Sequence, residues 1–166
     1  MDLFVIRHAR AVDTTEPIED ALRPLTARGR REALEVGKAL REAEVSLDAI
    51  ITSPLVRAIE TAELVAVGLK FEGALDVAVE LSPSRHPQSV IEEAVLPRSD
   101  LRAIAIVGHE PQLSSLVGAL LNTAVPGLAK TAAVRLVWDG LDAPARFKWV
   151  VKPGLSKPSR DLTEIG

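Results

Sequence analysis

Hydrophobic residues in this chain form short runs, which alternate with longer segments whose apolar positions recur every three to four residues. This alternation is typical of an α/β domain whose strands pair largely in parallel. The parallel strands expected from these runs cover residues 3–6, 49–51, 75–79 and 103–107. Two later runs, 132–138 and 145–151, flank the turn pair Asp139-Gly140 and predict an antiparallel pair near the C-terminus.

Helices are predicted in the intervening segments, covering about 26–43, 53–66, 87–96 and 111–120. Thr26 is a suitable N-cap for the first of them. Ser53 followed by Pro54 predicts the start of the second, because a capping hydroxyl before a proline at the first helical position is a strong start signal.

Composition indicates one globular unit. The chain has 166 residues, of which 47% are hydrophobic and 26% charged, and it has no cysteine. A chain of this length buries a core large enough to fold without disulfides or a structural metal. We expect a single domain over residues 1–152 and an irregular tail over 153–166, where Pro153 and Pro158 interrupt regular structure.

Several classes of function are disfavoured by the same composition. Without cysteine there is no thiolate nucleophile, zinc knuckle or iron–sulfur cluster. A formal net charge of −3 and only five aromatic residues argue against a nucleic-acid partner. No segment predicts a signal peptide or a membrane span, so we expect a cytoplasmic protein that does not bind membranes.

Charged and polar residues follow three of the predicted strands directly. Arg7 and His8 follow the first strand, Arg57 lies shortly after the second, and His109 follows the fourth. Because ligands of open α/β sheets bind at the carboxyl ends of parallel strands, these segments are expected to meet in one crevice. Arg57 also falls in the first turn of its predicted helix, where free backbone N–H groups favour an anion.

These residue types fit the chemistry of a phosphoryl group. Arginine is always charged and binds phosphoryl oxygens with a planar fork of donors. A neutral imidazole can attack phosphorus and carry the phosphoryl group covalently, while a second, protonated histidine can stabilise charge in the transition state. Such a site requires no metal ion.

Four ordered segments resemble motifs of the histidine phosphatase superfamily, also called the phosphoglycerate-mutase-like family. Residues 4–9 resemble its Arg-His-Gly motif, 25–29 its helix start, 52–62 its Ser-Pro-x-x-Arg-Ala segment, and 107–109 its second histidine motif. Within the superfamily, the segments 20–26 and 109–111 are similar to those of SixA-type phosphohistidine phosphatases. The resemblance implies a three-layer α/β/α fold with a mostly parallel central sheet, in a minimal version without a large lid insertion.

The resemblance also implies roles for individual residues: His8 as the nucleophile, Arg7 and Arg57 as phosphate-binding residues, and His109 as the second catalytic histidine. It implies no metal or other cofactor. Glu80 is a candidate proton donor, because it follows the third strand where members acting on small esters place theirs.

Ala9 departs from the family pattern, which usually has glycine at this position. An alanine there costs about 1 kcal/mol if the backbone needs a positive φ. Outside the proposed catalytic group, Asp20 and Arg23 are expected to pair and fix the loop before the first helix. His86 is expected to be a loop residue.

The function implied by this resemblance is a metal-independent phosphatase that removes phosphate from a protein histidine through a phosphohistidine intermediate. The expected partner is a phosphorylated protein such as a histidine phosphotransfer domain of a two-component relay. A small-molecule phosphomonoesterase using the same site is the enzymatic alternative. A phosphoprotein-binding module without catalytic activity is the alternative from a different class.

Overall fold

A computed structural model describes residues 1–13, 15, 17–155 and 157–166. It contains six strands in one sheet: β1 (Asp2–Arg7), β2 (Ala49–Thr52), β3 (Leu75–Val77), β4 (Ala103–Gly108), β5 (Ala133–Val137) and β6 (Arg146–Val151). Their order across the sheet is β3-β2-β4-β1-β5-β6. The first four strands pair in parallel, and β5 pairs antiparallel with both β1 and β6. The expected mostly parallel sheet with a late antiparallel pair is therefore confirmed.

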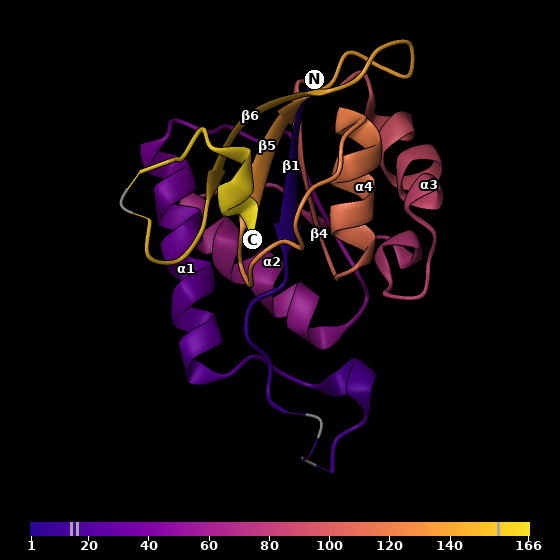
Figure 1. Cartoon of the computed structure of the whole chain (residues 1–166). Coiled ribbons are helices and arrows are strands. Elements are labelled where there is room, and N and C mark those ends of the chain that lie inside the picture. The colour runs from indigo at the N-terminus through magenta and orange to yellow at the C-terminus, as the bar shows by residue number, and fades with distance from the viewer. Residues whose placement is uncertain (14, 16, 156) are drawn as a thin grey trace.

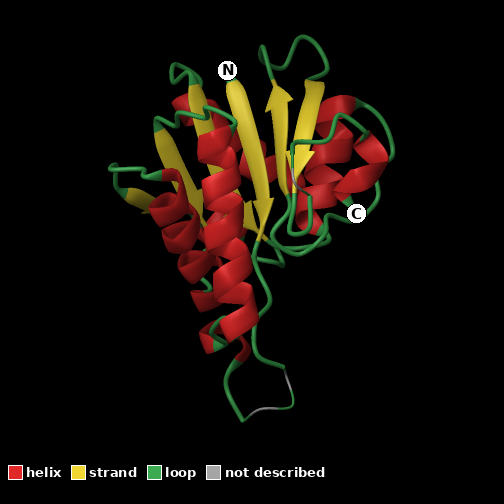
Figure 2. Cartoon of the chain, turned by 90° about the vertical axis from the view of Figure 1, so that its left-hand side faces the viewer, coloured by secondary structure: helices red, strands yellow, loops and turns green. Residues whose placement is uncertain are grey.

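Helices cover both faces of this sheet (Figures 1 and 2). On one face lie α1 (Ala27–Glu42) and α2 (Val56–Leu69), which bury Phe4 and Ile6 of β1. On the other face lie α3 (Pro87–Ser89), the segment that follows it, and α4 (Gln112–Leu121), which bury Leu3 and Val5. Because successive side chains of a strand point to opposite faces, β1 contributes to two apolar cores, and the expected three-layer α/β/α architecture is confirmed.

Two glycines allow α1 and α2 to pack closely. A Cβ atom at Gly37 would lie 2.4 Å from the carbonyl oxygen of Val65, and one at Gly68 would lie 2.5 Å from that of Leu34. Neither helix can accept a side chain at these positions without moving away from its neighbour. This contact fixes the position of α2, whose N-terminal end carries Arg57.

The boundaries of three predicted elements differ from the observed ones. The third strand ends at Val77 rather than residue 79, because Val79–Leu81 forms a 3-10 turn. The second helix begins at Val56, with Leu55 in an extended conformation as its N-cap. The third helix is not continuous: α3 passes into a π-helical turn, Val90–Val95, and a 3-10 turn, Leu96–Arg98.

The C-terminal segment packs on the domain. Its last residues form a 3-10 turn, Leu162–Ile165, and Ile165 is fully buried in the same core as Leu3 and Val5. Ser159 also forms an antiparallel bridge with Val150. Of the helices in the described part of the chain, none has both the length and the apolar character that crossing a bilayer requires.

Candidate active site

Three strand ends meet at the carboxyl edge of the sheet, at the lower end of β1 in Figure 1. The backbone N–H of His8 donates to the carbonyl of Gly108 at 3.0 Å, which places His8 beside the end of β4. The N–H of Ser53 donates to Val107 at 3.0 Å, which places the end of β2 on the other side of β4. The structure thus brings together the predicted segments around residues 8, 53 and 109.

His8 is buried, with 6% of its surface exposed. Its Nδ1 lies 2.7 Å from the carbonyl oxygen of Ala9, which can only accept a hydrogen bond. Nδ1 therefore carries the proton, and Nε2 keeps its lone pair. Burial lowers the pKa of His8 to about 2, with further lowering by the positive charge of Lys130 and by His109. The imidazole is neutral at physiological pH, as a nucleophile must be.

His109 lies next to His8, with ring centroids 4.9 Å apart and planes at 50°. Its Nε2 and the hydroxyl of Ser53 share a hydrogen bond of 2.8 Å. Its Nδ1 is buried without a hydrogen-bond partner among the described residues. Burial, followed by the charge of Arg57, lowers the pKa of His109 to about 3. Desolvation and neighbouring cations thus disfavour the imidazolium form of His109 in the free protein.

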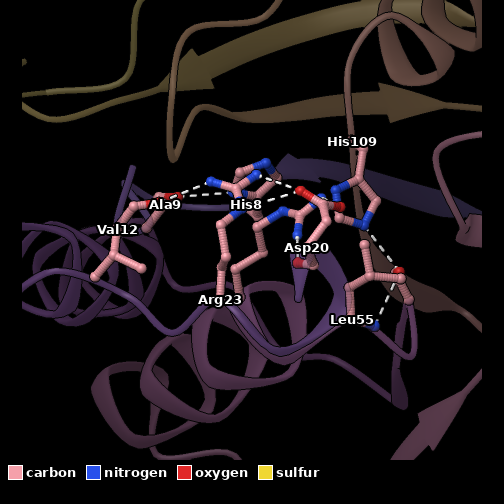
Figure 3. A network of polar contacts seen from close by, with 9 residues as sticks. His8, Ala9, Val12, Asp20, Arg23, Leu55 and His109 are labelled. Carbon is pink, nitrogen blue, oxygen red and sulfur yellow. Dashed lines mark hydrogen bonds and ion pairs between the residues drawn. The ribbon is translucent and has the colours of Figure 1, made fainter. Parts of the chain in front are cut away.

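Arg57 lies in the first turn of α2 and is 4% exposed. Its guanidinium donates to the backbone carbonyl of Asp20 at 2.7 Å and to the carboxylate of Asp20 at 3.2 Å. Arg23 donates to the same carboxylate through Nε at 3.0 Å and through a terminal nitrogen at 2.8 Å. The expected pairing of Asp20 with Arg23 is confirmed, and Figure 3 shows the network that it forms near His8 and His109.

Arg7 ends β1 and points to the segment before β5, where its guanidinium donates to the carbonyl of Leu128. Its Nε is buried and has no partner in the described part of the chain. Burial lowers the pKa of Arg7, and the carboxylate of Glu110 opposes this shift. Arg7 and Arg57 each have a buried Nε–H group without a partner among the described residues, and the charges of both act on His109.

Ala9 occupies its position without backbone strain, since it is not one of the described non-glycine residues with positive φ. Its N–H donates to the hydroxyl of Thr61 at 3.0 Å, and that hydroxyl donates to the carbonyl of Arg57 at 2.6 Å. Its methyl group is fully buried in a small cluster with Leu25 and Ala33. The strain expected for alanine at this position is therefore absent.

Glu80 lies in the 3-10 turn that follows β3. Its backbone carbonyl accepts a hydrogen bond of 2.8 Å from the side chain of Gln112, which also donates to the carbonyl of Arg85. Gln112 thus ties the loop after β3 to α4. His86 is exposed and N-caps α3 by accepting from Gln88, in agreement with the expectation of a loop residue.

Sequence reasoning missed two features of the site. The first is the contact of Asp20 with Arg57, which joins residues 37 positions apart and has no local signal. The second is Lys130, whose charge acts on both His8 and His109 and which belongs to no motif. Among the described residues, no group of three His, Cys, Asp or Glu side chains is arranged to hold a metal ion.

The fold and the paired histidine and arginine residues define a class of protein. The model of the histidine phosphatase superfamily (branch 1) matches residues 3–80, and this chain belongs to that superfamily. The chain is 26% identical over 160 residues to the phosphohistidine phosphatase SixA of Escherichia coli strain K12, covering 92% of this chain and 94% of that protein.

Two further comparisons agree. An uncharacterized protein of Picosynechococcus is 32% identical over 135 residues, covering 72% of this chain and 73% of that protein. The structure of the protein histidine phosphatase SixA complexed with tungstate superimposes with a TM-score of 0.84 at 25% identity, covering 92% of this chain and 97% of that one. These similarities support phosphatase activity of the histidine phosphatase type.

Proposed function

We propose that this protein is a metal-independent phosphatase that hydrolyses phosphohistidine on another protein through a covalent intermediate on His8. The observation that carries the proposal is the state of His8: its Nδ1–H is held by the carbonyl of Ala9, which leaves Nε2 as a neutral nucleophile beside His109. We propose that the enzyme acts in the cytoplasm, where the phosphotransfer domains of two-component relays occur.

In the first step, His8 Nε2 forms a bond to phosphorus while the bond from phosphorus to the substrate's imidazole nitrogen breaks. The substrate's imidazole takes up a proton from solvent and leaves. In the second step, water attacks phosphorus and gives up a proton to solvent while the bond between phosphorus and His8 Nε2 breaks, so inorganic phosphate is released and the neutral imidazole is restored. Dividing one displacement into two lowers each barrier.

Arg7 and Arg57 are proposed to bind the phosphoryl oxygens. Burial lowers the pKa of each, and each has an Nε–H without a partner in the described part of the chain, so each retains capacity for an anion beyond its present contacts. The first turn of α2 adds free backbone N–H groups near Arg57. A bound phosphoryl group also raises the pKa of His109, because a nearby anion stabilises the imidazolium. His109 then donates a hydrogen bond to the transferred group.

The leaving group explains why a strong acid is not needed. An imidazole with a free pKa of about 6.5 leaves more easily than an alkoxide. Among the described residues, the carboxylate of Glu80 forms no hydrogen bond or ion pair with His8 or His109, and we propose that Glu80 is dispensable for phosphohistidine. Glu80→Gln then keeps full activity across pH; a large loss confined to this variant would instead assign Glu80 as the proton donor.

The connection between β3 and β4 carries no large insertion, and this favours a protein substrate. The segment between β3 and β4 packs against the core through Val90, Ile91, Ala94 and Val95, all of which are buried. It forms part of the helical layer beside α4 and does not extend over the strand ends as a lid (Figure 1). The similar SixA protein is itself a phosphohistidine phosphatase. A phosphorylated side chain on a protein surface is the substrate that such a site admits.

The test is phosphate release from a histidine-phosphorylated phosphotransfer domain in the presence of EDTA. Wild type is expected to release phosphate and His8→Ala is not, while His86→Ala serves as the control because it removes an exposed histidine from a loop. Denaturing the wild-type enzyme during turnover is expected to trap acid-labile phosphate on His8. Inhibition by EDTA would contradict metal independence.

Two other outcomes would replace the proposal. Higher efficiency on sugar or nucleotide phosphates than on the phosphoprotein would make the protein a small-molecule phosphomonoesterase. Stoichiometric binding of the phosphoprotein without phosphate release would make it a binding module.

A further inference from the structure

Lys130 lies in a tight turn that leads into β5. The N–H of Ala132 donates to the carbonyl of Ala129 at 3.0 Å, which closes a four-residue turn with Lys130 and Thr131 at its centre. Thr131 has a φ of 65°, as the third position of a type II turn requires. A β-branched residue is rare in this conformation and costs on the order of 1–3 kcal/mol, so the surroundings must hold the turn in place.

Hydrogen bonds on both sides of the turn keep it in place. The guanidinium of Arg7 donates to Leu128, and the backbone N–H of Arg7 donates to Ala132 at 3.1 Å. The N–H of Ala129 donates to the carbonyl of Ile165 at 2.7 Å, so the C-terminal turn, yellow in Figure 1, lies against the same segment. The position of Lys130 relative to Arg7 is therefore fixed by the backbone.

The charge around Lys130 is unbalanced. Its ammonium is half-buried and is repelled by the positive charges of four arginines: Arg7, Arg57, Arg23 and Arg10. Three of these arginines have acidic partners: Asp20 pairs with Arg23 and Arg57, and Glu32 pairs with Arg10. Arg7 has the carboxylate of Glu110 nearby.

Lys130 itself has no hydrogen bond or ion pair among the residues that the structure describes. A cation held among cations, partly removed from water and without an acidic partner, is costly unless an anion binds there.

We propose that Lys130 binds the phosphoryl group together with Arg7 and Arg57, with its ammonium contacting the oxygens that the two guanidinium groups leave free. This assignment rests on the proposed function for the nature of the substrate, but binding of a phosphoryl group by Lys130 is independent of what the phosphate is attached to. Unlike the two arginines, Lys130 loses its charge within an accessible pH range.

Burial and the neighbouring arginines lower the pKa of Lys130 to about 8. The groups that face it are the four arginines named above and the two histidines, His8 and His109, whose pKa values are lowered to about 2 and about 3. The arginines keep their charge, and the histidines stay neutral, between pH 6.5 and pH 9.5. In the free protein, Lys130 is thus a group that loses its charge as the pH rises past 8, and comparison with Lys130→Arg separates this loss from any titration of His109 in the complex.

The test measures binding of inorganic phosphate by isothermal titration calorimetry to wild type, Lys130→Met and Lys130→Arg. Removing a charged donor is expected to weaken binding at pH 7 about 10-fold or more in Lys130→Met. Lys130→Arg is expected to bind within about threefold of wild type at pH 7 and to bind more tightly than wild type at pH 9.5, because its charge persists. Lys148→Met, which removes an exposed lysine on β6, is the matched control.

Two results would overturn the assignment: equal phosphate affinity of Lys130→Met and wild type, or a parallel decline of wild type and Lys130→Arg above pH 8. Urea unfolding midpoints identify any variant that fails to fold, and Lys130→Gln replaces Lys130→Met in that case. If the phosphohistidine assay fails while the phosphate titrations behave as expected, the proposed substrate is wrong and the role of Lys130 stands.

Discussion

Replacing Ala9 with glycine tests whether alanine is a defect in this site. The resemblance to Arg-His-Gly motifs suggests that glycine would improve the geometry next to His8. The structure argues the opposite, because Ala9 has no positive φ and its methyl group is fully buried against Leu25 and Ala33. We therefore expect Ala9→Gly to lower stability and to leave the chemistry unchanged.

The magnitude follows from two contributions. Removing one buried methyl group costs about 0.8 kcal/mol. Greater freedom of the unfolded backbone at glycine adds about 0.4–1 kcal/mol. The free energy of unfolding should fall by about 1.5 kcal/mol, which corresponds to a decrease in Tm of about 3–6 °C for a chain of this size. Activity should stay within about threefold of wild type, because the carbonyl of residue 9 still accepts the Nδ1–H of His8.

The assay is urea and thermal unfolding of wild type, Ala9→Gly and a control, Ala74→Gly. Ala74 is exposed in the loop before β3, so its replacement changes the freedom of the backbone without removing a buried methyl group. The difference between the two variants isolates the packing of Ala9. A variant that is as stable as wild type, or one that gains 10-fold or more in turnover, would refute the reasoning.

Three further predictions concern stability. Gly29→Ala should destabilise the fold by about 1–3 kcal/mol although alanine favours helices, because its Cβ would lie within 3 Å of backbone atoms of Arg10; an unchanged Tm would contradict this. Thr26→Ala should cost about 1 kcal/mol in urea unfolding, since its hydroxyl caps α1 by accepting from the N–H of Gly29 at 3.0 Å, whereas Thr26→Ser should cost little. Acid should destabilise the protein, because His8 and His109 have folded pKa values below the unfolded value of about 6.5. The contribution of each histidine is complete at about pH 8 and falls by about 2 kcal/mol between pH 8 and pH 5. Unfolding free energies of wild type and the His8→Asn, His109→Asn double variant at both pH values check this, and equal pH slopes would contradict it.

Local patterns predicted the elements whose structure depends on nearby residues. Thr26 was recognised as the N-cap of α1, and the antiparallel pair around Asp139-Gly140 was predicted from its turn signal. The convergence of the segments around residues 8, 53 and 109 followed from a general property of parallel sheets, that their carboxyl ends lie at one edge. These predictions needed no information about distant contacts.

The misplaced boundaries have tertiary causes. Ser53 was expected to cap α2, but its hydroxyl forms a hydrogen bond with His109 and accepts from the N–H of Leu55 at 3.3 Å, and the helix begins three residues later. The third helix was expected to be regular, but burial of Val90 and Ile91 against the sheet accompanies a π-helical turn. In both places, contacts with other elements outweigh the local preference of the sequence.

In the proposed mechanism, the cations of the site have two roles. A nucleophilic imidazole must be neutral, and a phosphoryl substrate must be bound by positive charge. Burial together with the charges of Lys130 and Arg57 keeps His8 deprotonated, and the same side chains attract the anion. Asp20 limits this effect, since its carboxylate partly neutralises Arg57 and opposes the lowering of the pKa of His109. In the proposed mechanism, a bound phosphoryl group raises the pKa of His109, and Nε2 of His8 keeps its lone pair because Nδ1 carries the proton.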